Sequence, residues 1–192
     1  MKTLNLKKTT KLLSVMVMLC ISFYNPLTSF AQQKAKQSNV KPPKQDIHTT
    51  IITDNMVALK QHIEAGSDLN IKEGMGGSSP LITATLFGKT AMAKALIDAG
   101  ANINLQNNDG STALHVASFF CRPAIVKMLL AKGANRGIKN KYGSTAYESL
   151  LVPFKDVKGV YDMMGKMLAP MGLKLDYTYI EATRPKIAAI IK

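Results

Sequence analysis

The stretch Gly110–Asn135 decides the fold, because the chain repeats its pattern at a fixed distance. It reads GSTALHVASFFCRPAIVKMLLAKGAN, and Gly77–Asn102, which lies 33 residues earlier, reads GSSPLITATLFGKTAMAKALIDAGAN. Each copy predicts a short helix, a turn and a second helix that stops at a glycine. A unit of this size cannot cover its own apolar face, so several units must stack to bury a core.

Local residue choices support this assignment. Thr112 can cap the first helix of the later copy, and Ser79 followed by Pro80 makes the same start one unit earlier. Apolar residues recur at helical spacing in the second helices, namely Met92, Leu96 and Ile97, then Ile125, Leu129 and Leu130. Glycines open the units at Gly77, Gly110 and Gly143, and glycines end the second helices at Gly100 and Gly133.

The 33-residue period, with T-A-L-H-V-A at 112–117, resembles the ankyrin repeat, whose signature is T-P-L-H-x-A followed by a helix pair. The resemblance implies an all-α solenoid of stacked helix-turn-helix units with projecting turns. It also implies that His115 is a structural histidine bonded near Thr112, with a catalytic or ligand role as the alternative. The structural motif residues are Ser79, Pro80, Thr112, His115, Thr145, Gly77, Gly100, Gly110, Gly133 and Gly143.

Partial copies flank the two clear ones. Residues 46–76 predict a divergent first unit with a turn at Asp54, as an end cap requires, and the clear units occupy 77–109 and 110–142. A fourth unit, 143–192, opens at Gly143, but Pro153 ends its first helix early. We expect its second helix to begin at Arg184, so that residues 153–183 are an insertion.

The insertion predicts one helix of its own. Val157, Tyr161, Met164 and Leu168 form a single apolar stripe, and Pro170 should terminate the helix. The methionines of this region, Met163, Met164, Met167 and Met171, leave three interpretations open. They fill an irregular gap against the last repeat, they form a deformable partner surface, or their thioethers bind Cu(I).

The first 45 residues lie outside the repeats. Four lysines, an apolar run at 12–24 and a small-x-small site ending at Ala31 are typical of a signal peptide, which we expect to be cleaved after residue 31. An uncleaved anchor is the alternative, although the run falls short of the roughly 20 apolar residues of a membrane span. Residues 32–45 predict a disordered basic linker. We therefore expect an exported monomer without a membrane span, periplasmic rather than extracellular.

Export changes what the charge and the cysteines imply. The net charge of +13 falls to +9, because the signal carries four lysines and no acidic residue. Only Cys121 remains, so no internal disulfide can form. We expect Cys121 to be a buried side chain at the turn between helices, and the alternative is a reactive or intermolecular thiol.

The sequence contains no recognisable catalytic set. His48, His62 and His115 lack metal-pair spacing, and the glycine run 74–77 lacks the lysine of a phosphate-binding loop. We therefore predict no enzymatic activity, no cofactor and no bound metal.

The ankyrin resemblance implies a protein partner that is bound by the turn tips and the first helices. Carried over by position, the partner-binding residues are Met75, Ser78, Leu86, Phe87, Asn108, Asp109, Ser111, Phe119, Phe120, Lys141, Tyr142 and Ser144. The three phenylalanines are the expected aromatic anchors, and the alternative is that one of each pair packs against its neighbour or the insertion. The alternative is a polyanion binder for lipopolysaccharide, glycan or nucleic acid, which the charge favours. Nucleic acid is the weakest of these, because aromatic residues do not interleave with the basic ones.

Overall fold

The computed structural model describes residues 39–192, so the expected signal peptide and most of the expected linker lie outside it. Within residues 39–192 the regular elements are all helical, which confirms the all-α prediction. They are α3 (Ile47–Ile52), α4 (Met56–Glu64), α5 (Pro80–Leu86), α6 (Thr90–Asp98), α7 (Ala113–Phe119), α8 (Pro123–Ala131), α9 (Glu148–Leu151), α10 (Phe154–Leu168), the 3-10 turn η1 (Ala169–Met171) and α11 (Tyr177–Ile191).

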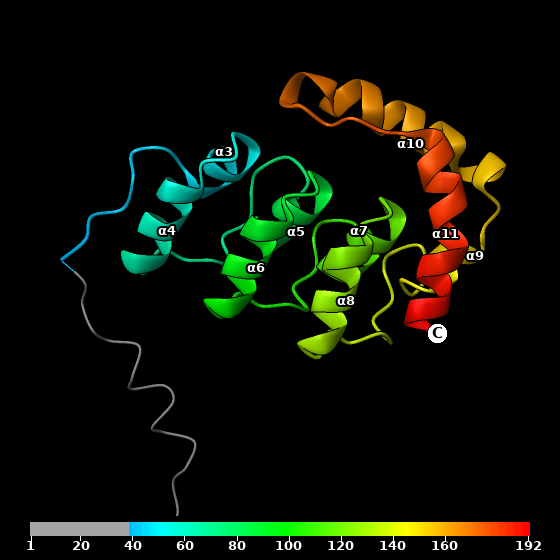
Figure 1. Cartoon of the computed structure of the whole chain (residues 1–192), viewed down its shortest axis with the longest axis horizontal. Helices are drawn as coiled ribbons and strands as arrows, with labels where there is room; N and C mark the ends of the chain where they lie inside the picture. The colour runs from blue at the N-terminus through cyan, green and yellow to red at the C-terminus, as the bar shows by residue number, and fades with distance from the viewer. Residues whose placement is uncertain (1–38) are drawn as a thin grey trace, which may run out of the picture. The chain divides into compact units, whose positions relative to one another are not determined.

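The helix pairs α3/α4, α5/α6 and α7/α8 stack in chain order (Figure 1). The first helices α3, α5 and α7 pack on one another, and so do the second helices α4, α6 and α8. Thr50, Ala84 and Ala117 occupy equivalent places in the first helices and are completely buried. Side chains of this size let neighbouring helices approach closely, while leucines of the second helices such as Leu96 and Leu129 fill the core.

The predicted caps and stops form. The Ser79 hydroxyl accepts a hydrogen bond from the Ile82 N–H at 3.3 Å, and in the fourth unit Thr145 and Glu148 cap each other reciprocally. Asp46 caps α3 by accepting from two backbone N–H groups. Positive φ angles between 67° and 88° occur at all the glycines assigned by the repeat, which are Gly77, Gly100, Gly110, Gly133 and Gly143.

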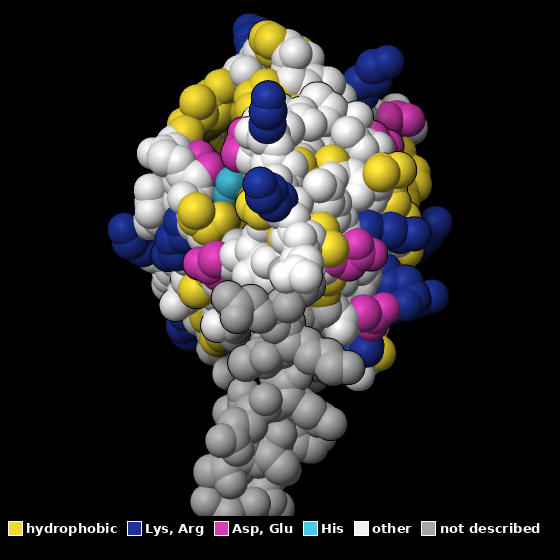
Figure 2. Space-filling model, turned by 90° about the vertical axis from the view of Figure 1, so that its left-hand side faces the viewer, with side chains coloured by type: hydrophobic (Ala, Val, Ile, Leu, Met, Phe, Trp, Pro, Cys, Tyr) yellow, Lys and Arg dark blue, Asp and Glu magenta, His cyan; other side chains and the backbone are white. Residues whose placement is uncertain are grey.

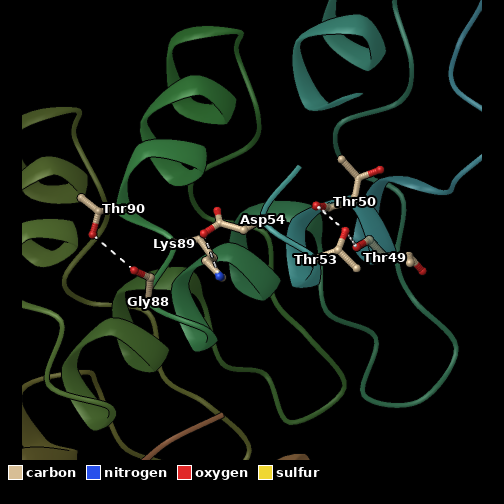
Figure 3. A network of polar contacts seen from close by, with 7 residues as sticks. All are labelled: Thr49, Thr50, Thr53, Asp54, Gly88, Lys89 and Thr90. Atoms are coloured by element: carbon tan, nitrogen blue, oxygen red, sulfur yellow. Dashed lines mark hydrogen bonds and ion pairs between the residues drawn. The ribbon is translucent and has the colours of Figure 1, made fainter. Parts of the chain in front are cut away.

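The turn between the two helices of a unit needs one left-handed residue. Gly88 takes this conformation at φ 67° in the second unit, but Asp54 (φ 58°) and Cys121 (φ 53°) hold the equivalent places in the first and third units. An aspartate tolerates this region better than most residues. Figure 3 shows Asp54 directed at Lys89 of the next unit, whose Nζ lies 3.0 Å from Asp54 Oδ2. The ion pair therefore joins successive turns along the stack.

Residues 41–45, which the sequence places in the linker, lie against α4. The Gln61 side chain donates to the Lys41 carbonyl at 2.9 Å. His62 Nε2 lies 2.9 Å from the Gln45 carbonyl, which can only accept, so Nε2 carries the proton and Nδ1 accepts from the Ser67 hydroxyl. The packed region thus begins a few residues before the first predicted helix.

The fourth unit differs from the prediction at one boundary. The second helix, α11, begins at Tyr177 and not at Arg184, so the insertion ends at residue 176. Asp176 caps the helix by accepting from the Tyr179 N–H at 3.0 Å, and Ile180 and Thr183 are already buried. An arginine-proline pair, Arg122-Pro123, opens α8 at its first turn. The matching pair Arg184-Pro185 lies instead in the interior of α11, where burial of the flanking turns maintains the helix through Pro185.

The insertion helix follows the predicted stripe. Tyr161 and Leu168 of α10 are buried, and Val157 and Met164 pack against the core. The helix ends at Leu168, and Pro170 lies in the 3-10 turn that follows. Over residues 39–192, no helix combines the length and apolar character that a membrane crossing needs.

Candidate functional site

The turns that project from the stack are shaped by internal hydrogen bonds. The Asn107 carbonyl oxygen Oδ1 accepts from the backbone N–H of Asp109 and Ser111, and Asn140 does the same one unit later for Tyr142 and Ser144. An amide side chain that caps its own turn in this way fixes the tip without a helix or a strand.

The turn that precedes α5 is one residue longer than the later turns. In it the carboxylate of Glu73 takes the place of the Asn107 and Asn140 amides. Glu73 Oε1 accepts from the N–H groups of Gly76 and Ser78 at 2.8 and 2.9 Å. Partial burial opposes ionisation of Glu73, but the backbone donors outweigh it and hold the pKa below its usual value. The tip that carries Met75 is therefore held by side-chain hydrogen bonds to its own backbone, as the later tips are.

Backbone bonds connect successive tips. The Asn108 N–H donates to the Gly76 carbonyl at 2.9 Å, and the Lys141 N–H donates to the Asp109 carbonyl at 2.8 Å. Nearer the helices, Asn70 Oδ1 accepts from the N–H of Asn102 across one unit boundary. The equivalent Asn104 accepts from Asn135 across the next. The turns thus form one continuous ladder.

Two apolar side chains stand out on this ladder. Met75 is 74% exposed and Tyr142 is 77% exposed, at opposite ends of the row of tips. Asn108, Asp109 and Lys141 lie between them in the row and are exposed. The remaining predicted turn residues, Ser78, Ser111 and Ser144, are partly buried, as are Leu86 and Phe87 at the end of α5.

Of the two predicted aromatic anchors in the third unit, Phe120 is buried and Phe119 is partly covered by the insertion. Phe120 is 3% exposed and belongs to the core. The Phe119 ring stacks on Tyr161 of the insertion, with centroids 4.2 Å apart and planes 15° apart. The insertion therefore covers part of the face that the sequence assigned to a partner, with Phe120 in the core and Phe119 partly buried against Tyr161.

The insertion is attached by a polar node that the sequence analysis missed. Tyr161 Oη donates to the Phe119 carbonyl at 2.6 Å and accepts from Arg184 Nη1 at 3.0 Å. Arg184 Nη2 also donates to the carbonyls of Ser149, Leu150 and Val152 at the end of α9. Burial raises the pKa of the Tyr161 hydroxyl to about 12, so it stays protonated and can donate. The sequence analysis treated Arg184 only as the start of a helix, and nothing in that pattern indicated that its side chain is buried and bonded to Tyr161.

His115 has the structural role that the repeat implies. Its Nε2–H donates to the Ser144 carbonyl of the next unit at 3.1 Å, and Nδ1 accepts from the Thr112 N–H at 3.2 Å. Burial lowers the pKa of His115, and the Ser144 carbonyl opposes that shift only in part. His48 holds the matching place in the first unit and bridges to the Ile71 carbonyl and the Thr83 hydroxyl.

The methionine cluster divides between core and surface. Met164 packs against the core, whereas Met163 is 60% exposed, Met167 52% and Met171 37%.

Cys121 is buried at 1% exposure, and its Sγ–H donates to the Ile180 carbonyl at 3.4 Å. No cluster of three His, Cys, Asp or Glu side chains suited to a metal ion occurs in the part of the chain that the structure describes.

The charges visible at the first-unit end are mixed. Figure 2 shows lysine and arginine side chains interspersed with acidic and apolar ones over this end of the stack. A face whose charges all had a positive sign would favour polyanions. The side chains visible here carry charges of both signs.

Comparison with known proteins identifies repeats over the first three helix pairs. A family model described as ankyrin repeats, in three copies, matches residues 48–140. Residues 48–140 of the chain are ankyrin repeats. This ankyrin-repeat protein is similar to the crystal structure of the ankyrin repeat domain of Bcl-3, described as a unique member of the IkappaB protein family, with 31% identity and a TM-score of 0.52. That match covers 53% of this chain and 45% of the Bcl-3 chain, so it spans under half of that chain's length.

No curated protein matches the sequence. The repeats themselves indicate a protein–protein interaction module. They leave open which surface of this ankyrin-repeat protein binds, because one repeat architecture supports many unrelated partners.

Proposed function

We propose that this ankyrin-repeat protein is a non-catalytic module that binds a partner protein through its turn-tip surface, defined as Met75, Asn108, Asp109, Lys141 and Tyr142. The observation that carries the proposal is the pair of exposed apolar side chains, Met75 and Tyr142, on turns held in register by backbone hydrogen bonds. Methionine and tyrosine are among the residues enriched at protein interfaces.

Rigidity of the turn tips favours binding. A side chain on a fixed turn loses less conformational freedom on association than one on a mobile loop. Tyr142 is fixed through its own N–H, which donates to Asn140 Oδ1 at 3.0 Å, while its ring remains free. Asp109 and Lys141 lie between the two apolar anchors and supply charges of both signs, which would favour one orientation of the partner.

Site-specific photocrosslinking tests this surface. A photoreactive phenylalanine analogue replaces Tyr142 or Met75, and the matched control replaces Lys127, an exposed residue of the second helix α8. We expect the same crosslinked protein from positions 142 and 75 and none from 127. Equal crosslinking at 127, or none at 142 and 75, would contradict the proposed surface.

We also propose that the chain is exported and acts in the periplasm. The support is the amino-terminal sequence, with four lysines, an apolar run and a small-x-small site ending at Ala31. The mass of the protein recovered from cells tests this directly. A chain that begins at Gln32 in a periplasmic extract supports export, and a chain that retains residues 1–31 in the cytoplasm contradicts it.

A further inference from the structure

We propose that two copies of this chain join through the end of the stack formed by α9 and α11, and that the join is a two-fold symmetric pair. We define this end face by Leu151, Val152, Glu181, Pro185, Lys186 and Ala189. It is separate from the turn-tip surface, so the inference does not depend on the proposed function.

The end face is the place where another repeat would stack. Figure 1 shows α9 and α11 at the end of the helix pairs opposite α3 and α4, with no element of residues 39–192 beyond them. Here Leu151 is 58% exposed and Val152 is 40% exposed.

A groove of about 400 Å³ lies between the two helices of this end. Val152, Pro153 and Phe154 line one side, and Glu181, Pro185 and Ala188 of α11 line the other. The groove exists because α9 stops after a single turn, so no full first helix runs beside α11. Its lining is mostly apolar, which suits an apolar side chain.

The neighbouring surface of α11 allows close approach. Ala182, Pro185 and Ala189 are exposed at spacings of three and four residues, so they share one side of the helix. Side chains this small let another helix approach without first displacing long charged groups. The face thus offers a groove, the exposed Leu151 at its edge and a smooth helix surface beside it.

The charges on the face indicate a second copy as the occupant. Glu181 and Lys186 are both exposed on α11, and neither forms an ion pair within the described residues. In a two-fold interface residue i of one copy meets residue j of the other, and j meets i. Each Glu181 can then face the Lys186 of the other copy, while each Leu151 enters the opposite groove. Each copy then offers the other an apolar side chain for its groove and charges of opposite sign to its own.

Sedimentation velocity of the chain over roughly two decades of concentration tests the pair. We expect a concentration-dependent shift from the monomer to twice its mass. Leu151→Asp places a charge at the groove and should weaken the association at least about tenfold. The matched control is Val57→Asp on α4, where the wild-type side chain is 79% exposed at the other end of the stack, and it should leave the association unchanged.

A charge swap provides the second test and does not depend on the apolar residue. Glu181→Lys and Lys186→Glu should each weaken the pair about tenfold, because like charges then meet. The double variant restores opposite charges and should recover most of the association. A chain that stays monomeric at all concentrations overturns the inference, as does equal weakening by Val57→Asp or a double variant as weak as the single ones.

Discussion

Arg184 and Tyr161 form a hydrogen bond of 3.0 Å in the interior, where Arg184 is 3% exposed and Tyr161 is fully buried. The contact joins α11 to α10, and the further bonds of both side chains reach α7 and α9. A guanidinium can bind several carbonyls at once because its donors lie in a rigid plane. One buried pair thus attaches the insertion to the third and fourth repeats.

Tyr161→Phe should lower the free energy of unfolding by about 1–3 kcal/mol. The ring would still stack on Phe119, but the Phe119 carbonyl and Arg184 Nη1 would each lose a partner at a place where Tyr161 and Arg184 are buried. Urea unfolding measures the change. Tyr142→Phe is the matched control, because that side chain is exposed, and it should stay within about 0.5 kcal/mol of the wild type. Equal effects of the two variants would contradict the role of the node.

The Cys121 thiol should be unreactive in the native protein. Burial raises its pKa to about 11, and the side chain is 1% exposed. At pH 8 about one thiol in a thousand would be ionised, and only the thiolate attacks a disulfide reagent. In a Cys20→Ser chain, a coloured aromatic disulfide should label Cys121 slowly until urea unfolds the protein, and then rapidly. Rapid labelling without urea would indicate an exposed, reactive thiol.

Stability should depend on pH through His115. Its pKa in the folded chain lies below the ordinary value of 6.5, because burial disfavours the charged ring and the bond to Ser144 offsets this only in part. Above pH 6.5 both states are neutral and the contribution is complete. As the pH falls below 6.5 the unfolded chain binds a proton first, so stability is lost progressively until the folded pKa is reached.

The measurement is the free energy of unfolding between pH 7.5 and 5, compared with His115→Gln. The difference between wild type and variant should shrink with falling pH, by no more than about 1.4 kcal/mol per pH unit for one proton. A difference that is constant over this range would show that His115 does not titrate between the two states.

Alanine variants of two glycines distinguish the cost of the left-handed backbone conformation from the cost of a close contact. Gly110 and Gly133 both have positive φ, at 72° and 81°, but a Cβ at Gly110 would lie 3.0 Å from the Lys141 backbone nitrogen, whereas a Cβ at Gly133 would meet nothing within 4 Å. Both alanine variants should cost about 1–2 kcal/mol for the left-handed conformation. Gly110→Ala should cost more, because the fixed Lys141 backbone cannot move away. Equal melting temperatures of the two variants would contradict the close approach.

The sequence by itself determined the repeats. Their period, the cap at Thr112 and the stop at Gly133 are local signals, because capping and left-handed turns depend on residues within a few positions of one another. The resemblance to the ankyrin repeat also implied the role of His115, whose partner Thr112 lies three residues away. The stripe on α10 was visible for the same reason, as helical spacing needs no tertiary contact.

Only the tertiary structure decided what the insertion covers. Phe119 and Phe120 appeared exposed from their place in the repeat, but Tyr161, which lies 42 residues from Phe119 in the chain, packs on both rings, so that Phe120 is buried and Phe119 is partly buried. The start of α11 at Tyr177 followed from burial of Ile180 and Thr183, which outweighs the preference of a proline for a first turn. Contacts of this range depend on how whole helices pack, and no local spacing in the sequence encodes them.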